Sequence, residues 1–533
     1  MLLYFHKVKQ TLNHMKKILP FLFFSLCLGS VSIAQECLSE GIKIVRQGQI
    51  DSFSILYPGC TFLKGSIELD GSGGEIINLH GLAQLKRIGG GFSIHDLNGL
   101  NSLAGLDSIG RIDGAIDIYQ NPDLHSCLGL NGLTYVGKLF HIRENMLLQN
   151  LSGLEKLDLI GGHLWINNNP NLLSIVNLVS LDSIGGAVII SENHRLKSLE
   201  GLHHIRVLKG NSNIFQNDSL LNYSGLRSLK INKGDLTLRS NQSTINFIGF
   251  DSLTTIYGYL SIADNHAKNL DGFEALDEIW DDLYIDENDS LLNLEGLDHL
   301  RLVKGTLWIT DNPSIISLSG LSSLREVGSL QVKDNLSLQS FSGLENLTSI
   351  KRNLNISRND QLVDITGLSQ ITTFEGDLTV FLNKMLPSIR GLDHLNSTGI
   401  TNVNLLGSEK LTECAIESIC NYLYSGGPYT ISGNDHGCNT REEIITACLV
   451  AVKDPAENEH VTLSPNPTTG VIEILGLKNI KSYISVFNSQ GMLVRRVSTD
   501  NNWIDISDLS DGMYLVSIPT ETGNLLRKLI KCQ

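Results

Sequence analysis

Candidate ligand-contacting side chains recur at two fixed positions of this sequence, four and two residues before a series of regularly spaced asparagines. Exposed aromatic rings on a rigid surface can stack on sugar rings or anchor a protein partner. The alternative is that the same rings only cover the surface by aromatic and aliphatic packing. The ligand-face candidates are Tyr119, His141, Arg143, Trp165, Phe215, Arg239, Tyr284, Trp308 and Phe381.

A second set of side chains has the chemistry of a metal site. Four acidic residues each stand one position before successive asparagines, and carboxylates repeated at ~5 Å intervals can hold calcium. The alternative is a solvated acidic edge beside Lys333 and Arg358, and we therefore predict no metal. The weak calcium candidates are Asp264, Glu287, Asp311 and Asp334.

Catalytic motifs are missing from the sequence. Gly132, Gly137 and Lys138 have the spacing of a phosphate-binding loop, but Leu139 stands where a Ser or Thr must bind magnesium. Both glycines also fall on positions of an internal repeat. Neither HExxH nor GxSxG occurs. We therefore expect no enzymatic activity and no cofactor.

Charge and composition narrow the class of protein. The 533 residues include 41 basic and 56 acidic side chains, which gives a formal net charge of −15. Phosphate contacts need clustered Lys and Arg, so a nucleic-acid partner is not expected. A hydrophobic fraction of 41% with 18% charged residues is typical of a folded chain rather than a disordered one.

An internal repeat would position the candidate side chains. Its clearest copy runs from Leu154 to Ile175, and weaker copies before and after the main series give about fifteen coils in all. The asparagines are 24 residues apart, except for two steps of 23. They are Asn121, Asn145, Asn169, Asn193, Asn217, Asn241, Asn265, Asn288, Asn312, Asn335, Asn359 and Asn383.

Each coil supplies one short strand. Leu164 and Ile166 alternate with polar neighbours, which predicts a strand with both side chains inward. The Gly161-Gly162 pair permits the turn before the strand. Asn169 ends the strand, and its amide can bond to the turn and to the asparagine of the next coil. We expect a mainly β fold, a right-handed parallel β-solenoid with a cap at each end.

Cysteines cluster at both ends of the repeats, which suggests disulfide-stapled caps in an oxidising compartment. The four cysteines of the C-terminal cap allow three pairings, and we favour one of them. Cys127 falls on an apolar repeat position, so we expect a buried free thiol there. The predicted pairs are Cys37–Cys60, Cys414–Cys438 and Cys420–Cys448.

The chain divides into six segments. A basic start, an apolar run and the small-x-small sequence Ser32-Ile33-Ala34 predict a cleaved export signal over residues 1–34, with a membrane anchor as the alternative. The other segments are an N-terminal cap (35–65), the solenoid (66–413), a Cys-rich C-terminal cap (414–449), a polar linker (450–460) and a C-terminal domain (461–533).

The repeats resemble a known family. An asparagine three residues beyond Leu-x-Ile is similar to a leucine-rich repeat. The Ile-Gly-Gly turn and the sequence from Cys60 to Leu69 more specifically resemble the receptor L domain, which forms the ligand-binding lobes of insulin-type and growth-factor-type receptors. The resemblance covers about residues 60–413. It implies a rigid, ligand-binding solenoid.

The C-terminal segment carries a different pattern of short alternating strands and Gly turns, which predicts a small β-sandwich. An ordered set of motifs resembles the C-terminal sorting domain of the type IX secretion system of Bacteroidetes. The resemblance implies passage across both membranes, the secretion machinery as a partner, and release or attachment at the cell surface. The motif residues are Pro465, Asn466, Pro467, Gly470, Gly491, Gly512 and Tyr514.

Together these features predict an exported binding or adhesion protein that presents a parallel sheet to an unknown protein or glycan. Two alternatives remain open. One is a structural surface-layer protein. The other is a carbohydrate-active enzyme on a β-helix, although such an enzyme should carry long insertions that build a groove, and these coils vary by one residue only.

Overall fold

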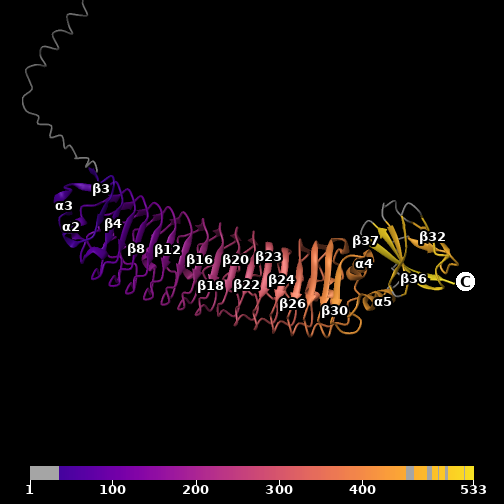
Figure 1. Cartoon of the computed structure of the whole chain (residues 1–533). Coiled ribbons are helices and arrows are strands. Elements are labelled where there is room, and N and C mark those ends of the chain that lie inside the picture. The colour runs from indigo at the N-terminus through magenta and orange to yellow at the C-terminus, as the bar shows by residue number, and fades with distance from the viewer. Residues whose placement is uncertain are drawn as a thin grey trace, which may run out of the picture.

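The protein is a long rod of stacked coils with a small domain at its C-terminal end (Figure 1). The computed structural model describes residues 35–451, 461–476, 483–489, 491–498, 502–520 and 523–532. The predicted export signal and nearly all of the predicted linker lie outside the described residues. Within them, no helix combines the length and the apolar character needed to cross a membrane.

One parallel sheet runs the length of the rod, because each coil adds one strand in register with the last. The solenoid has about 17 turns, and each turn contributes one strand to this main sheet. Its strands are β2 (Ile42–Ile44), β4 (Ile67–Asp70), β6 (Phe92–His95), β8 (Ile116–Tyr119), β10 (Phe140–Arg143), β12 (Leu164–Asn167), β14 (Val188–Ser191), β16 (Ser212–Phe215), β18 (Leu236–Arg239), β20 (Leu260–Ala263), β22 (Leu283–Asp286), β23 (Leu302–Thr310), β24 (Glu326–Lys333), β26 (Leu354–Ser357), β28 (Gly376–Phe381), β29 (Ile400–Leu406) and β30 (Tyr429–Ser432).

A second row of shorter parallel strands precedes the main sheet in most coils, and we call it the second sheet; it pairs in two stretches, from β1 to β13 and from β15 to β27. In β23 and β24 the chain continues from the second sheet into the main sheet without a break. The other strands are β1 (Gln35–Cys37), β3 (Cys60–Leu63), β5 (Arg87–Ile88), β7 (Arg111–Ile112), β9 (Tyr135–Val136), β11 (Leu159–Ile160), β13 (Ser183–Ile184), β15 (Val207–Leu208), β17 (Ile231–Asn232), β19 (Thr255–Ile256), β21 (Glu278–Ile279), β25 (Ser349–Ile350) and β27 (Thr373–Phe374).

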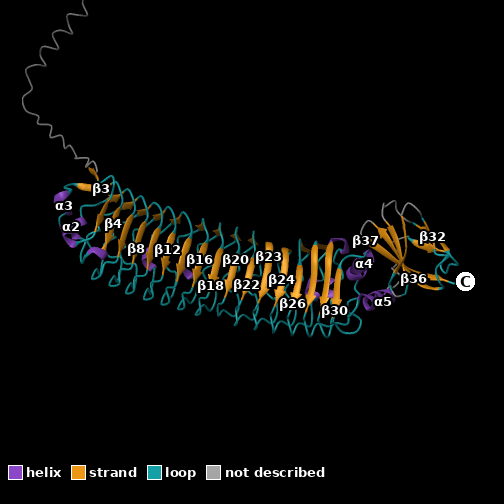
Figure 2. Ribbon diagram, viewed as in Figure 1, coloured by secondary structure: helices purple, strands orange, loops and turns teal. Residues whose placement is uncertain are grey.

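The remainder of each coil is loop, with occasional single 3₁₀ turns (Figure 2). No coil between the two caps, a stretch that the structure describes throughout, contains an α-helix. The 3₁₀ turns are Gly71–Gly73, His80–Leu82, Val176–Leu178, Ser224–Leu226, Thr366–Leu368, Arg390–Leu392 and Ser397–Gly399.

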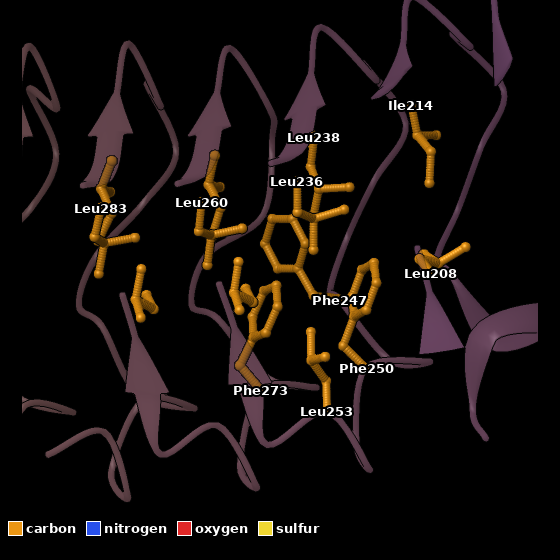
Figure 3. Packing of buried hydrophobic residues seen from close by; sticks show 14 of the residues in the cluster. Leu208, Ile214, Leu236, Leu238, Phe247, Phe250, Leu253, Leu260, Phe273 and Leu283 are labelled. Atoms are coloured by element: carbon orange, nitrogen blue, oxygen red, sulfur yellow. The ribbon is translucent and has the colours of Figure 1, made fainter. Parts of the chain in front are cut away.

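The interior of the rod is one continuous apolar core. Leu164 and Ile166 are fully buried while Trp165 between them is not, which confirms the predicted alternation. Aromatic rings fill the wider part of several coils: Phe250 and Phe273 stack with centroids 5.1 Å apart. Figure 3 shows these rings against the leucines of the main sheet. Each coil therefore buries its apolar side chains mainly against its neighbours, as expected for a solenoid.

The asparagine ladder is confirmed. All twelve asparagines are at most 2% exposed. Asn217 is typical: its Oδ1 accepts from the backbone N–H of Asn193 at 3.2 Å, and its Nδ2 donates to the carbonyl of Ile190 at 2.9 Å. Its own N–H donates to the Oδ1 of Asn241 at 3.0 Å. The side chain thus satisfies backbone groups that a sharp turn would otherwise leave buried and unpaired.

The Gly161-Gly162 pair before β12 has a different role from the predicted one. Gly161 and Gly162 do not adopt the left-handed conformation that would require glycine. A Cβ at Gly161 would instead lie 2.4 Å from the carbonyl oxygen of Gly137 in the preceding coil. Glycine is therefore needed for close stacking between coils rather than for turn geometry.

Both caps extend the sheet, so the repeat count of about fifteen was too low. β2 lies in the N-terminal cap with helices α2 (Gln47–Asp51) and α3 (Phe53–Leu56), and β30 lies in the C-terminal cap between α4 (Glu417–Ser425) and α5 (Arg441–Ala451). These helices occupy the two ends of the rod in Figure 2. A sequence search for the repeat misses both strands because no full consensus copy surrounds them.

The predicted disulfide bonds are confirmed in all three pairs, and the favoured pairing of the C-terminal cap is the one present. Cys127 is a buried free thiol, as predicted, and its burial raises its pKa to about 12. Cys532 is free and exposed. The Cα–Cα distances are 5.7 Å for Cys37–Cys60, 5.6 Å for Cys414–Cys438 and 5.9 Å for Cys420–Cys448.

The C-terminal domain consists of two antiparallel sheets around their own apolar core, in agreement with the predicted sandwich. It rests on the C-terminal cap. Tyr424 of α4 packs on Phe487 with ring centroids 4.8 Å apart, and Arg441 donates to the carbonyl of Gly491 at 3.3 Å. One sheet contains β31 (Thr462–Ser464), β32 (Val471–Leu475) and β35 (Trp503–Asp505), and the other β33 (Tyr483–Phe487), β34 (Leu493–Ser498), β36 (Gly512–Thr520) and β37 (Gly523–Lys531).

Candidate functional site

The candidate residues lie on the outward face of the main sheet, in two columns along the rod. Because the strands pair in register, equivalent residues of successive coils are direct neighbours. His141 stands beside Trp165, and Tyr284 stands beside Trp308. The sheet therefore brings together residues that are about one coil apart in sequence, and it keeps distant candidates apart.

The first group of candidates lies on β8, β10 and β12. The guanidinium of Arg143 sits over the ring of Tyr119 at 4.0 Å and pairs with Glu144 at 2.8 Å. Trp165 contacts the ring of His141 edge-on at 5.3 Å. These contacts fix four of the candidates against one another.

His141 departs from the expectation for a ligand contact. It points to the outward face but is only 8% exposed, and its Nε2 is 2.8 Å from Oδ1 of Asn167. Burial lowers the pKa of His141 below its usual range. This histidine therefore packs against Trp165 and contacts Asn167, and little of its surface is accessible to a partner.

The second group lies on β22 and β23 and on the residue before β20, near the middle of the rod (Figure 1). The rings of Tyr284 and Trp308 are stacked, with centroids 6.1 Å apart and planes 11° from parallel, as the sequence predicted for neighbours. Tyr259 meets Tyr284 edge-on at 5.9 Å. The Tyr284 hydroxyl donates to Asp282 at 2.6 Å, and burial together with this carboxylate raises the pKa of Tyr284 to about 12. The result is a fixed aromatic cluster of three residues.

The remaining candidates stand alone. Arg239 pairs with Glu287 two coils further along, at 2.9 Å. Phe381 lies beneath the guanidinium of Arg358 at 5.7 Å. Phe215 neighbours Ser191 and Arg239 in register and joins neither aromatic group. These three residues cover the sheet without forming a common site.

The acidic column occupies an unusual backbone position. The residue before each asparagine is left-handed, with φ of +52° at Asp264 and Asp311 and +57° at Asp334. Asp334 pairs with Lys333 and Arg358, both at 3.3 Å, and Glu287 is engaged by Arg239. Burial and the charges of neighbouring carboxylates raise the pKa of Asp311. The column is thus partly neutralised by cations of the protein itself.

Potential metal ligands converge elsewhere. Among the described residues, Glu68, Asp70 and His95 form the group whose ligand atoms lie within 4.8 Å of one another. The ammonium of Lys43 lies 2.8 Å from Glu68 and 2.7 Å from Asp70. These contacts lower the pKa of Asp70 and raise that of Lys43. A cationic group of the chain already occupies the centre of the cluster, which favours an ion-pair network over a metal site.

Sequence reasoning missed a further column, at the position held by Gly161 in the clearest repeat. It follows the second-sheet strand of five consecutive coils. Tyr257 is 50% and Trp280 41% exposed, and their rings stack with centroids 5.9 Å apart. A tabulation of the residues at this one repeat position would have found it. The column consists of Lys209, Lys233, Tyr257, Trp280 and Lys304.

The C-terminal domain shows how its motif residues work. Asn466 donates to the carbonyl of Lys528 at 2.7 Å and accepts from the N–H of Ile530 at 2.9 Å, so the motif fastens to the last strand. The Tyr514 hydroxyl donates to the carbonyl of Ser510 at 2.6 Å. These contacts are internal, which assigns the motif to folding of the domain.

The described chain is thus a solenoid with disulfide-bonded caps followed by a small antiparallel sandwich. Residues 462–532 match the family model of the secretion system C-terminal sorting domain. None of the curated proteins searched matches the chain. The sorting domain marks the protein as exported by the type IX secretion system to the cell surface or the medium, with the machinery of that system as its partner in transit.

Proposed function

We propose that this protein is a non-enzymatic exported binding or adhesion protein whose main sheet presents a ligand face to a protein or glycan. The observation that carries the proposal is the aromatic cluster of Tyr259, Tyr284 and Trp308. Its rings are held edge to face and stacked on the outward side of a rigid sheet. Rigid aromatic anchors that lose little entropy on binding are typical of binding hot spots.

The solenoid also supports a more specific assignment, a leucine-rich repeat of the receptor L-domain kind. The Leu-x-Ile strands and the buried asparagine ladder agree with that assignment. Receptor L domains bind ligands through rigid repeat surfaces, so the assignment agrees with a binding role. An enzyme is disfavoured because the coils carry no insertion that would build a substrate groove.

The test is a glycan array and a surface-protein pull-down with the exported chain and its Trp308→Ala variant. We expect a ligand whose binding falls at least about tenfold in the variant, the loss typical of a hot-spot residue. Trp503→Ala is the matched control, because Trp503 is exposed in the sorting domain. Self-assembly into a layer without any ligand would support the structural alternative. Cleavage of an array glycan would support the enzyme.

A further inference from the structure

The basic–aromatic column, defined as Lys209, Lys233, Tyr257, Trp280 and Lys304, is a continuous surface feature. Backbone hydrogen bonds connect its members to the preceding coils. The N–H of Tyr257 donates to the backbone carbonyl of Asn232 at 2.9 Å, and the N–H of Trp280 donates to the backbone carbonyl of Ile256 at 2.9 Å. Glycine holds the same position in the coils on either side, at Gly185 and Gly328. At ~4.8 Å per coil the five side chains form a straight ridge roughly 19 Å long.

The two aromatic rings of the column contact their neighbours along the rod. Tyr257 and Trp280 stack against each other, and the Lys304 ammonium lies over the Trp280 ring at 4.6 Å. Both rings stay half exposed, so a ligand that lies along the column meets them together with the lysines.

The charge of the column is not neutralised by the protein. Within the described residues, Lys209, Lys233 and Lys304 have no ion-pair partner, although the chain as a whole carries −15. Two carboxylates stand beside the column: Glu278 lies 3.7 Å from the Arg301 guanidinium, and Asp281 is exposed next to Trp280. The column is thus a positive ridge on a negative rod.

We propose that this column binds an acidic polysaccharide lying along the rod axis, an inference that rests on the proposed binding function. Charge complementarity calls for an anionic partner, and a straight ridge of equally spaced groups calls for an extended polymer. Asp281, exposed beside Trp280, favours a glycan over a nucleic acid. Its carboxylate accepts hydrogen bonds from the free hydroxyls of polysaccharide sugars, whereas the sugar–phosphate backbone of DNA offers no free hydroxyl along its length. The exported location agrees with a glycan ligand.

The experiment compares three versions of the exported chain with polygalacturonate as the probe and uncharged dextran as the reference. The test variant is Lys209→Ala/Lys233→Ala/Lys304→Ala. The matched control is Lys156→Ala/Lys268→Ala/Lys410→Ala, which removes the same charge from exposed lysines away from the column. We expect polygalacturonate binding that weakens by about tenfold in the test variant and little in the control. Binding should also weaken between about 50 mM and 500 mM salt.

Three results would overturn the inference. The first is equal loss in both triple variants, which would indicate general charge attraction. The second is tighter binding of single-stranded DNA than of polygalacturonate, which would assign the column to nucleic acid. The third is no polygalacturonate binding at low salt. A ligand from the array that is lost in Trp308→Ala but unaffected by the lysine triple would leave the proposed function standing while this inference fails.

Discussion

The two ends of each main-sheet strand differ in how the coils use them. The end that leads into the ladder holds asparagine in twelve coils, all of it buried. The opposite end, where the chain arrives from the second sheet, holds glycine in many coils but Lys, Tyr and Trp in five consecutive ones. Both positions recur once per coil and both form columns along the rod. The two columns differ in which residue types fill them.

The difference teaches which positions of a solenoid are available for function. Each ladder side chain bonds to two backbone groups of the preceding coil, as Asn217 does to Asn193 and Ile190, so any exception costs stability there. At the strand end next to the second sheet, a side chain is accepted wherever it does not clash with the neighbouring coil. The Tyr257 and Trp280 side chains satisfy this condition because they project into solvent. A uniform column thus indicates a structural role, whereas a varied column at a tolerant position is open to changes that leave the fold intact.

Asn217→Ala should give the largest effect. It leaves the Asn193 N–H and the Ile190 carbonyl buried without partners. Each such group costs about 1–3 kcal/mol, so we expect a loss of about 2–6 kcal/mol for the two, measured by thermal or chemical denaturation. Asn213→Ala, on the outward face of the same coil, is the control and should cost far less. Equal losses would contradict the distinction between the two ends.

Gly161→Ala tests the strand end next to the second sheet, at a coil where a side chain would clash with the preceding coil. The new Cβ would lie 2.4 Å from the Gly137 carbonyl oxygen, and we expect a loss of about 1–2 kcal/mol from strain in the stack. Gly110→Ala is the matched control, because its Cβ would have its closest contact at 3.6 Å. If both variants melt together, close stacking is not the reason for glycine.

Trp280→Ala should be nearly neutral for folding. Its side chain is 41% exposed and packs on Tyr257 and Lys304 alone among the column residues. We expect a loss of about 1 kcal/mol or less by denaturation, well below that of Asn217→Ala. A larger loss would show that the column is part of the core and would weaken its assignment as a binding surface.

Asp311→Asn should give the smallest effect, and one that depends on pH. The pKa of Asp311 is raised in the folded state. The protonated carboxyl group therefore contributes stability, and this contribution is lost as the pH rises through the raised pKa. At pH 7 the variant should melt slightly higher than the parent, and the difference should vanish near about pH 3. Asp334→Asn is the contrast, because it removes ion pairs with Lys333 and Arg358 and should not raise the melting temperature.

The periodicity of the sequence was sufficient to predict those features of the fold that recur in every coil. The alternation around Ile166, the ladder at Asn217 and the pairing of Tyr284 with Trp308 all follow from spacing, because one coil predicts the next. The disulfide pairs followed from their places in the caps. The fold was therefore predicted in its main features.

What the sequence could not show arises where the pattern is broken. Asn434 continues the ladder by accepting from the N–H of Ser408 at 2.9 Å, yet it lies in the Cys-rich cap outside any consensus copy. The burial of His141 depends on the sizes of the side chains around it. The Tyr257–Trp280 stack stands at a position that holds glycine in other coils, so the consensus of the repeat carries no sign of it.

The placement of the disulfide bonds has a consequence for survival outside the cell. In a linear array the terminal coils have one neighbour instead of two, so fraying begins there. The cross-links Cys37–Cys60, Cys414–Cys438 and Cys420–Cys448 close loops at those two places. A protease needs a locally opened segment before it can cut. Fastening the two ends therefore protects every coil between them from digestion, including the long middle of the rod that contains no cross-link.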